Sequence, residues 1–107
     1  MKDIVDRLQE KRLVFKSFKH IDIKQQFGSR KKIDLYLGVD LKKYYACIIH
    51  ISKKSRILQK EAIELMKFHK KLESYNESKI KKKYIYIQAP LCSKAKALFE
   101  SEGWMVI

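Results

Sequence analysis

Two apolar segments joined by a pair of lysines constrain the fold of this chain most strongly. Residues 32–41 alternate between apolar and other side chains, with the period of two that is typical of a β-strand. Residues 44–51 are apolar on both faces, which is typical of a strand at the centre of a sheet. Because only Lys42 and Lys43 lie between the two segments, they predict an antiparallel hairpin.

Periodicity and breaker residues predict the other elements of an α/β fold. These are helices over 3–18, 57–73 and 93–102, and strands over 20–27, 84–87 and 104–107. Ser55 and Ser93 can cap the two later helices, and Gly103 can end the last one. The predicted fold is a single domain over residues 1–107 in the order α-β-β-β-α-β-α-β. Each β-α unit requires a crossover, so we expect a mixed sheet of four to five strands flanked by helices.

Composition excludes several classes of protein. A hydrophobic fraction of 46% provides an ordinary core, so the chain is not a disordered basic tail. Cys47 and Cys92 lack CxxC spacing and nearby histidines, which argues against a disulfide framework or a zinc site and favours reduced, buried thiols. No signal peptide is evident at the N-terminus, and the longest apolar run is far shorter than the ~20 residues of a membrane span. We therefore expect a cytoplasmic protein.

The charge balance predicts a negatively charged partner. The chain has 25 Lys and Arg against 12 Asp and Glu, a net charge of +13. Nucleic acid is the partner that such an excess favours, ahead of a membrane surface, because the basic residues are spread over several elements. We expect the hairpin entry, the loop after the third strand and the entry to the fourth strand to converge at one end of the sheet. The basic residues that we expect to bind phosphates are Arg30, Lys31, Lys32, Lys42, Lys43, Lys53, Lys54, Arg56, Lys81, Lys82 and Lys83.

Four tyrosines complete the predicted nucleic-acid surface. They lie on or beside predicted strands and are the aromatic residues that we expect to face solvent: Tyr36, Tyr44, Tyr84 and Tyr86. Exposed aromatic rings among lysines can stack on unpaired bases.

The order of elements, together with the segment Gly28-Ser29-Arg30-Lys31-Lys32-Ile33-Asp34-Leu35, resembles the PD-(D/E)XK nucleases. This superfamily includes Holliday-junction resolvases and many restriction enzymes. Its members carry an Asp on the second core strand and a Glu/Asp-x-Lys motif on the third. The carboxylates hold a divalent cation, and the lysine positions the attacking water. The resemblance implies Asp34 as the metal ligand and Mg²⁺ or Mn²⁺ as the cation.

The third-strand motif departs from the superfamily pattern. His50 stands at the acidic position and Ser52 at the lysine position, with Lys53 just beyond. The resemblance then implies Asp34, His50 and Lys53 as the catalytic candidates, with Lys53 positioning water. One carboxylate and one imidazole would hold Mg²⁺ poorly. The resemblance implies a nucleic-acid-binding protein, with DNA favoured over RNA, that is either a metal-dependent endonuclease or has a degenerate active site.

Two alternatives stay open. Leu37-Gly38-Val39-Asp40 resembles the first strand of RNase H-like nucleases, in which an Asp begins a carboxylate cluster for two metals. Asp34 and Asp40 would be ~20 Å apart on an extended strand and could not share a metal. The other alternative is a basic adaptor without enzymatic activity that joins a nucleoprotein assembly. Its apolar C-terminal segment, which includes Trp104, would pair with another protein or form a homodimer.

Overall fold

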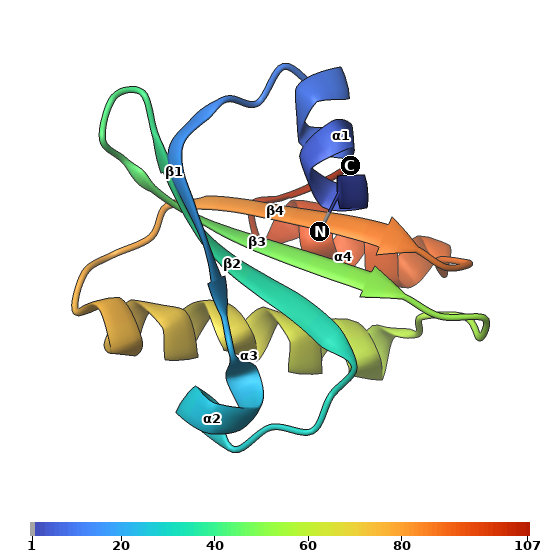
Figure 1. Cartoon of the computed structure of the whole chain (residues 1–107). Helices are drawn as coiled ribbons and strands as arrows, with labels where there is room; N and C mark the ends of the chain where they lie inside the picture. The colour runs from blue at the N-terminus through green and yellow to red at the C-terminus, as the bar shows by residue number, and fades with distance from the viewer. Residues whose placement is uncertain (1) are drawn as a thin grey trace.

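The computed structural model describes the backbone of residues 2–107 and the side chains of residues 4–107. Its centre is one five-stranded sheet in the order β1-β2-β3-β4-β5 (Figure 1). The strands are β1 (Phe15–Ile21), β2 (Ile33–Asp40), β3 (Tyr45–Ser52), β4 (Lys82–Gln88) and β5 (Trp104–Val106). The pairs β1–β2 and β2–β3 are antiparallel, whereas β3–β4 and β4–β5 are parallel. The predicted α/β class, the mixed sheet and the β2–β3 hairpin are confirmed.

Four helices flank this sheet: α1 (Lys2–Glu10), α2 (Ile23–Phe27), α3 (Gln59–Asn76) and α4 (Ser93–Ser101). In Figure 1, α3 and α4 lie along one face of the sheet and α1 lies over the other. The predicted order of helices and strands is confirmed, with the five-residue helix α2 in addition. No helix in the described part of the chain has the length and apolar character needed to cross a membrane.

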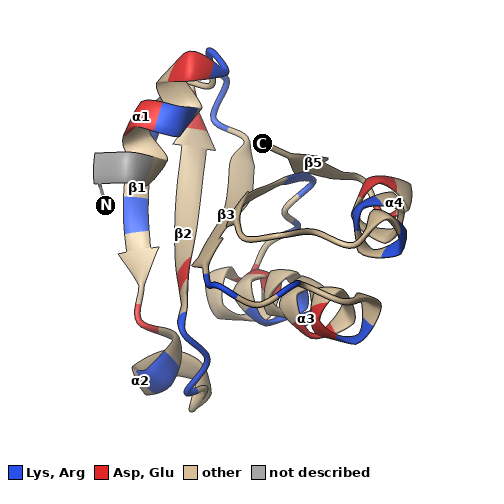
Figure 2. Ribbon diagram, turned by 90° about the vertical axis from the view of Figure 1, so that its right-hand side faces the viewer, with Lys and Arg blue, Asp and Glu red and all other residues tan. Residues whose placement is uncertain are grey.

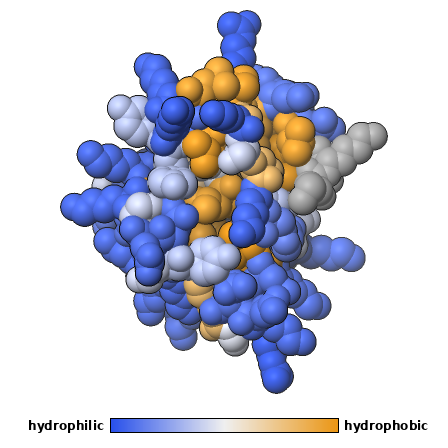
Figure 3. Space-filling model, turned by 60° about the vertical axis from the view of Figure 1, so that its left-hand side comes forward, coloured by the Kyte–Doolittle hydropathy of each residue, from blue (hydrophilic) through white to orange (hydrophobic). Residues whose placement is uncertain are grey.

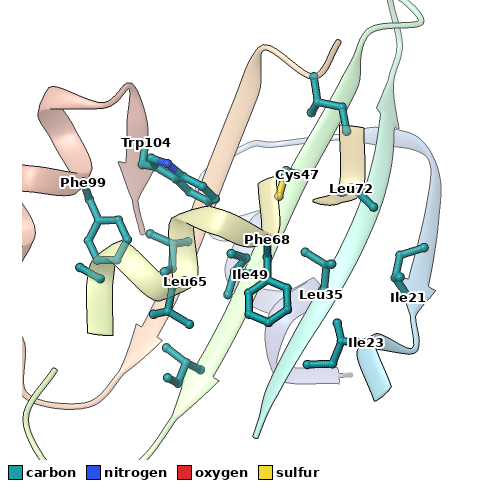
Figure 4. Close-up of a cluster of buried hydrophobic side chains, with 14 of the residues drawn as sticks. Ile21, Ile23, Leu35, Cys47, Ile49, Leu65, Phe68, Leu72, Phe99 and Trp104 are labelled. Atoms are coloured by element: carbon teal, nitrogen blue, oxygen red, sulfur yellow. The ribbon is translucent and has the colours of Figure 1, made fainter. Parts of the chain in front are cut away.

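The main core lies between the sheet and the pair α3 and α4. Alternate residues of β2 and β3, including Leu35, Cys47 and Ile49, point toward Phe68 of α3 and Phe99 of α4 (Figure 4). These side chains are almost completely removed from solvent. The prediction that the 44–51 segment is a central strand is confirmed, since its residues pack on both faces of the sheet.

A smaller core lies under α1. Ile4 and Leu8 of α1 pack on Tyr36 of β2 and Ile48 of β3. Gly38 makes room for this layer, because a Cβ atom there would lie 2.9 Å from Cδ1 of Phe15. Beside α1 the apolar layer is incompletely covered, and Figure 3 shows apolar side chains between basic ones on this side of the molecule.

The N-terminal third differs from the prediction. The helix predicted over 3–18 ends at Glu10, and Arg12 follows in the left-handed region with φ 58°. The chain then enters β1, where Phe15 and Phe18 pack on the sheet under the α1 layer. The apolar spacing that suggested one long helix belongs to two elements, because pairing with β2 outweighs the local helical preference.

The strand predicted over 20–27 is also wrong, except for its first two residues. The Asp22 carboxylate accepts hydrogen bonds from the N–H groups of Lys24 and Gln25 at 3.1 Å, and it thereby caps α2. Gly28, with φ 64°, ends this helix. The predicted serine caps are wrong as well, because α3 begins after Leu58 and the N-cap of α4 is Cys92.

The strand β1 is a free edge of the sheet, since it pairs only with β2. Its register against β2 shifts between Phe15 and Ser17, which marks a bulge or irregularity next to the turn of the β2–β3 hairpin. Lys16 and Lys19 of this strand are exposed. The edge is therefore irregular and positively charged.

Candidate functional site

The polar end of the α1-side face is the first candidate site. Helix α1 covers the part of that face built on Tyr36, Ile48 and Tyr84, and the start of β2 and the end of β3 are left open. An open pocket of about 310 Å³ lies there, lined by Lys32, Ile33, Asp34, His50 and Ser52. Asp34, predicted as the metal ligand, and His50, predicted as catalytic, are thus brought together.

Strand register explains this proximity. Asp34 pairs with His50 across the β2–β3 hairpin, so both side chains point to the same face. Nδ1 of His50 lies 3.9 Å from Oδ2 of Asp34. The Asp34 side chain is half exposed to solvent, whereas the His50 side chain is only 10% exposed.

Two residues of β4 hold the His50 imidazole. Its Nε2 lies 2.6 Å from Oε1 of Gln88, and in the tautomer that carries its proton on Nε2 this nitrogen donates to the amide oxygen. The ring stacks on Tyr86 with centroids 4.9 Å apart, and the guanidinium of Arg7 lies over the same tyrosine at 5.6 Å. Nδ1 is buried and has no hydrogen-bond partner among the described residues. This nitrogen lies toward the carboxylate of Asp34.

His20 is a site residue that the sequence analysis missed. Its Nε2 lies 3.3 Å from Oδ1 of Asp34, on the side away from His50. It also lines a second hollow of about 390 Å³ with Asp34, Lys24 and Arg30. Asp34 thus separates two adjoining polar hollows. No local sequence signal marks His20 or Gln88, because both approach the site through strand pairing over long range.

The donor set fits a hard divalent cation poorly. Among the residues that the structure describes, no three His, Cys, Asp or Glu side chains are arranged to hold a metal ion. Mg²⁺ prefers carboxylate and other oxygen ligands, and among the described residues that line the open pocket Asp34 alone carries a carboxylate. The neighbouring imidazoles suit other metals. We therefore assign no chemical step to a metal at Asp34.

Lys53 does not line the open pocket. Its Nζ lies 2.5 Å from Oε1 of Glu61 on α3, and its backbone N–H donates to the carbonyl of Gln88. The ammonium group that the sequence analysis assigned to water positioning is therefore paired with a carboxylate of another element. Lys32 is the lysine that lines the pocket beside Asp34.

The basic residues form two groups rather than the single one expected. The residues before β2 and after β3 lie at the Asp34 end of the sheet, as the blue segments of Figure 2 indicate. Because β4 is parallel to β3, the start of β4 lies at the opposite end, beside the β2–β3 turn. We call the first group the Asp34-end cluster: Arg30, Lys31, Lys32, Lys53, Lys54 and Arg56. The second is the turn-end cluster: Lys42, Lys43, Lys79, Lys81 and Lys82.

Acidic partners neutralise some of these lysines. Lys31 pairs with Glu64 at 2.8 Å and lowers the pKa of that carboxyl group. Lys82 pairs with Asp40 at 2.5 Å. Lys83 belongs to neither cluster, since its ammonium group donates to the carbonyl of Glu102 and lies over the ring of Trp104. Basic residues without an ion-pair partner among the described residues include Arg30, Lys32, Lys54, Arg56, Lys79 and Lys81.

The tyrosines are less exposed than expected. Tyr36 and Tyr84 are buried under the α1 layer, and Tyr86 is partly covered between His50 and Arg7. Tyr44 is the exception, with 59% of its surface exposed at the turn of the hairpin. Burial raises the pKa of Tyr36, and the negative charge of Asp34 raises it further.

Asp40 does not begin a carboxylate cluster of the RNase H kind. Its Oδ1 accepts the N–H groups of Lys42 and Tyr44 at 2.9 Å, and its Oδ2 accepts from Lys82. These contacts lower the pKa of the Asp40 carboxyl group, with the Lys82 hydrogen bond as the largest cause. Asp40 stabilises the hairpin turn.

Comparison with known proteins supports the fold. No protein-family model and no curated protein matches this sequence. Among solved structures, the chain is similar to EndoMS in its apo form, with 18% identity and a TM-score of 0.59 over 98% of the chain. A repair endonuclease from Pyrococcus abyssi and the EndoMS–dsDNA2 complex each give 17% identity and a TM-score of 0.55. The chain spans less than half the length of these proteins, 43% to 44%. It therefore has a nuclease-like fold, as the resemblance implied.

Proposed function

We propose that this chain binds DNA through the Asp34-end cluster. The observation that carries the proposal is the group Arg30, Lys32, Lys54 and Arg56, which lack acidic partners among the described residues and lie at the same end of the sheet as Asp34. Lys32 lines the open pocket, and Arg30 lines the adjoining hollow. Phosphate neutralisation by such side chains supplies most sequence-independent DNA affinity. The likeness to EndoMS, one structure of which is a complex with dsDNA, favours DNA over RNA as the partner.

We further propose that binding proceeds without Mg²⁺-dependent cleavage. Lys53 forms an ion pair with Glu61, and Asp34 is the one carboxylate among the described side chains of residues 4–107 that line the open pocket. In the nucleases that the sequence resembles, two carboxylates and a lysine would occupy these places. The chain is then a DNA-binding domain with a nuclease-like fold and a degenerate site.

The test is a fluorescence-anisotropy titration of labelled duplex DNA at several salt concentrations. The double variant Lys32→Ala, Lys54→Ala should weaken binding to duplexes of any sequence. The slope of the logarithm of the binding constant against the logarithm of the salt concentration should fall by about one for each lost contact between an ammonium group and a phosphate. The matched control Lys67→Ala, Lys96→Ala removes the same charge from exposed positions on α3 and α4. Equal effects of the two double variants would mean that binding follows net charge alone, and would contradict a localised interface.

A gel of the same samples with Mg²⁺ or Mn²⁺ tests the second part. We expect intact DNA, and we expect Asp34→Ala to bind at least as tightly as the unmodified chain because a negative charge is removed. Metal-dependent cutting that Asp34→Ala abolishes would show that the site is an active nuclease centre. Intact DNA with unchanged affinity in Asp34→Ala supports the binding function, including that of an adaptor.

A homodimer through the C-terminal segment is a separate prediction. Trp104 and Ile107 are buried in the chain's own cores, so Met105 is the large apolar side chain that β5 offers to a partner. Sedimentation equilibrium of the unmodified chain and of Met105→Lys would test it.

A further inference from the structure

A pocket at the turn end of the sheet has the chemistry of a second nucleic-acid subsite. It has a volume of about 390 Å³ and is lined by Tyr44, Tyr45, Lys79, Lys81 and Lys82. This volume lies in the range of ligand pockets, ~300–1,000 Å³. The residues come from the turn of the β2–β3 hairpin and from the start of β4, which the parallel pairing of Ala46 with Lys82 places side by side.

The backbone of this pocket is firmly held. The Asp40 carboxylate binds the N–H groups of Lys42 and Tyr44, and Lys43 takes the left-handed conformation with φ 69° that the turn requires. The same carboxylate holds the ammonium group of Lys82. The turn therefore fixes the backbone of Tyr44 and leaves most of its side chain exposed.

The side chains combine an exposed aromatic ring with excess positive charge. Tyr44 is among the most exposed large side chains of the described chain. Nζ of Lys82 lies 5.6 Å from its ring centroid, on one face. Lys79 and Lys81 are exposed and have no ion-pair partner among the described residues, so their charges are available to phosphates.

We infer that this turn-end pocket binds a single-stranded segment of nucleic acid. An unpaired base stacks on Tyr44, and the flanking phosphates contact Lys79 and Lys81. Aromatic side chains within a basic groove are the means by which proteins bind single strands without sequence preference. A membrane surface or an acidic protein would bind chiefly to the lysines and would have less need of an exposed aromatic ring among them.

This inference rests on the proposed DNA binding and extends it. Asp34 and Asp40 mark the two ends of β2 and are ~20 Å apart along the strand. That span corresponds to about six phosphates along one strand of a B-form duplex, at ~3.4 Å each. The substrate class is then DNA in which a duplex adjoins an unpaired strand. The duplex lies at the Asp34-end cluster and the unpaired strand at Tyr44.

The experiment compares three fluorescein-labelled probes by anisotropy: a 12-nucleotide oligothymidine, a 16-base-pair duplex, and that duplex with a 12-nucleotide overhang. We expect the overhang probe to bind more tightly than the blunt duplex. Tyr44→Ala should weaken binding of oligothymidine about 5- to 150-fold, the range for loss of one base stack. Tyr44→Phe keeps the ring and should retain the affinity, and blunt-duplex binding should be unchanged in both variants.

Several outcomes would overturn the inference. If Tyr44→Ala, with its fold verified by circular dichroism, binds oligothymidine normally while Lys32→Ala, Lys54→Ala does not, this pocket is not the single-strand subsite and the proposed function stands. If no probe binds at low salt, both proposals fail. Phosphatidylserine vesicles provide the last comparison. If the vesicles bind in a way that requires Tyr44 and oligothymidine does not displace them, the occupant of the pocket is a lipid surface.

Discussion

His50 and Gln88, 38 residues apart in the chain, are joined by a 2.6 Å contact between Nε2 and Oε1. Parallel pairing of β3 with β4 makes this contact possible, because it places Ser52 beside Gln88 and His50 beside Tyr86. The contact favours the tautomer with the proton on Nε2, and Nδ1 lies 3.9 Å from Oδ2 of Asp34.

The tautomer of His50 is therefore open to direct measurement. In ¹⁵N-edited NMR spectra of the imidazole groups at neutral pH, we expect the neutral Nε2–H form for His50. Gln88→Leu should remove this preference and, by leaving a buried ring nitrogen unpaired, cost about 1–3 kcal/mol of stability. The control Gln25→Leu, on the exposed side of α2, should change neither property. A dominant Nδ1–H form in the unmodified chain would contradict the assignment.

Asp40 should make the stability of the fold depend on acid pH. Its pKa is lowered from the ordinary value of 3.8, so the ionised carboxylate stabilises the native state above that value. This contribution is lost as the pH falls through the lowered, native-state pKa. Lys82 acts in the opposite range, because its raised pKa adds stability that disappears only at strongly alkaline pH.

Urea unfolding at several pH values checks this prediction. At pH 7, Asp40→Asn should unfold at lower urea concentration than the unmodified chain, and the difference should shrink as the pH falls below 3.8 toward the lowered native-state pKa. Glu73 has a lowered pKa as well, chiefly because it accepts the N–H of Ile80, so only the difference between the two chains isolates Asp40. A difference independent of pH would refute the role of the carboxylate charge.

Gly38 should tolerate no side chain while Phe15 stays in place. A Cβ atom there meets Cδ1 of Phe15 at 2.9 Å and Cδ1 of Ile48 at 3.1 Å. Gly38→Ala should cost about 1–3 kcal/mol, as overpacked cores generally do. In the background of Phe15→Leu the cost should fall, because the nearest aromatic ring is gone. Strict additivity of the two substitutions in urea unfolding would contradict this account.

The two cysteines should react at very different rates. Backbone N–H groups of Ala95 and Lys94 at the start of α4 lower the pKa of Cys92, whereas burial raises the pKa of Cys47. Mass spectrometry after brief treatment with iodoacetamide at pH 7 should find label on Cys92 only. Cys47 should become labelled after denaturation. Similar rates in the native protein would disagree with the burial of Cys47.

The hairpin illustrates how far a sequence can predict this fold. Alternation identified β2, because Leu35 and Leu37 of one face lie in the main core, although Tyr36 on the other face is buried as well. The apolar run correctly indicated that β3 is a central strand. The register is subtler. A turn of Lys42 and Lys43 alone would pair Asp34 with Ile51, whereas the observed turn includes Leu41 and pairs Asp34 with His50. A shift of one residue decides which side chain faces Asp34.

The site was only partly predictable for similar reasons. The proximity of Asp34 and His50 could be predicted because they lie on adjacent strands of one hairpin, whereas the positions of His20 and Gln88 depend on the strand order of the whole sheet. The expected convergence of basic runs failed because it ignored the direction of β4. Helix α2, by contrast, carried a readable signal, an Asp cap followed six residues later by Gly28.

The irregular register and the lysines of β1 affect how readily copies of the chain associate through this edge. An unpaired strand of regular geometry offers its backbone to the same strand of another molecule and can start fibril growth. Here the register shift near Phe15 breaks the ladder that a second copy would have to follow, and Lys16 and Lys19 would meet the like charges of that copy. The features that deform this edge thereby favour a chain that stays dispersed when it is concentrated.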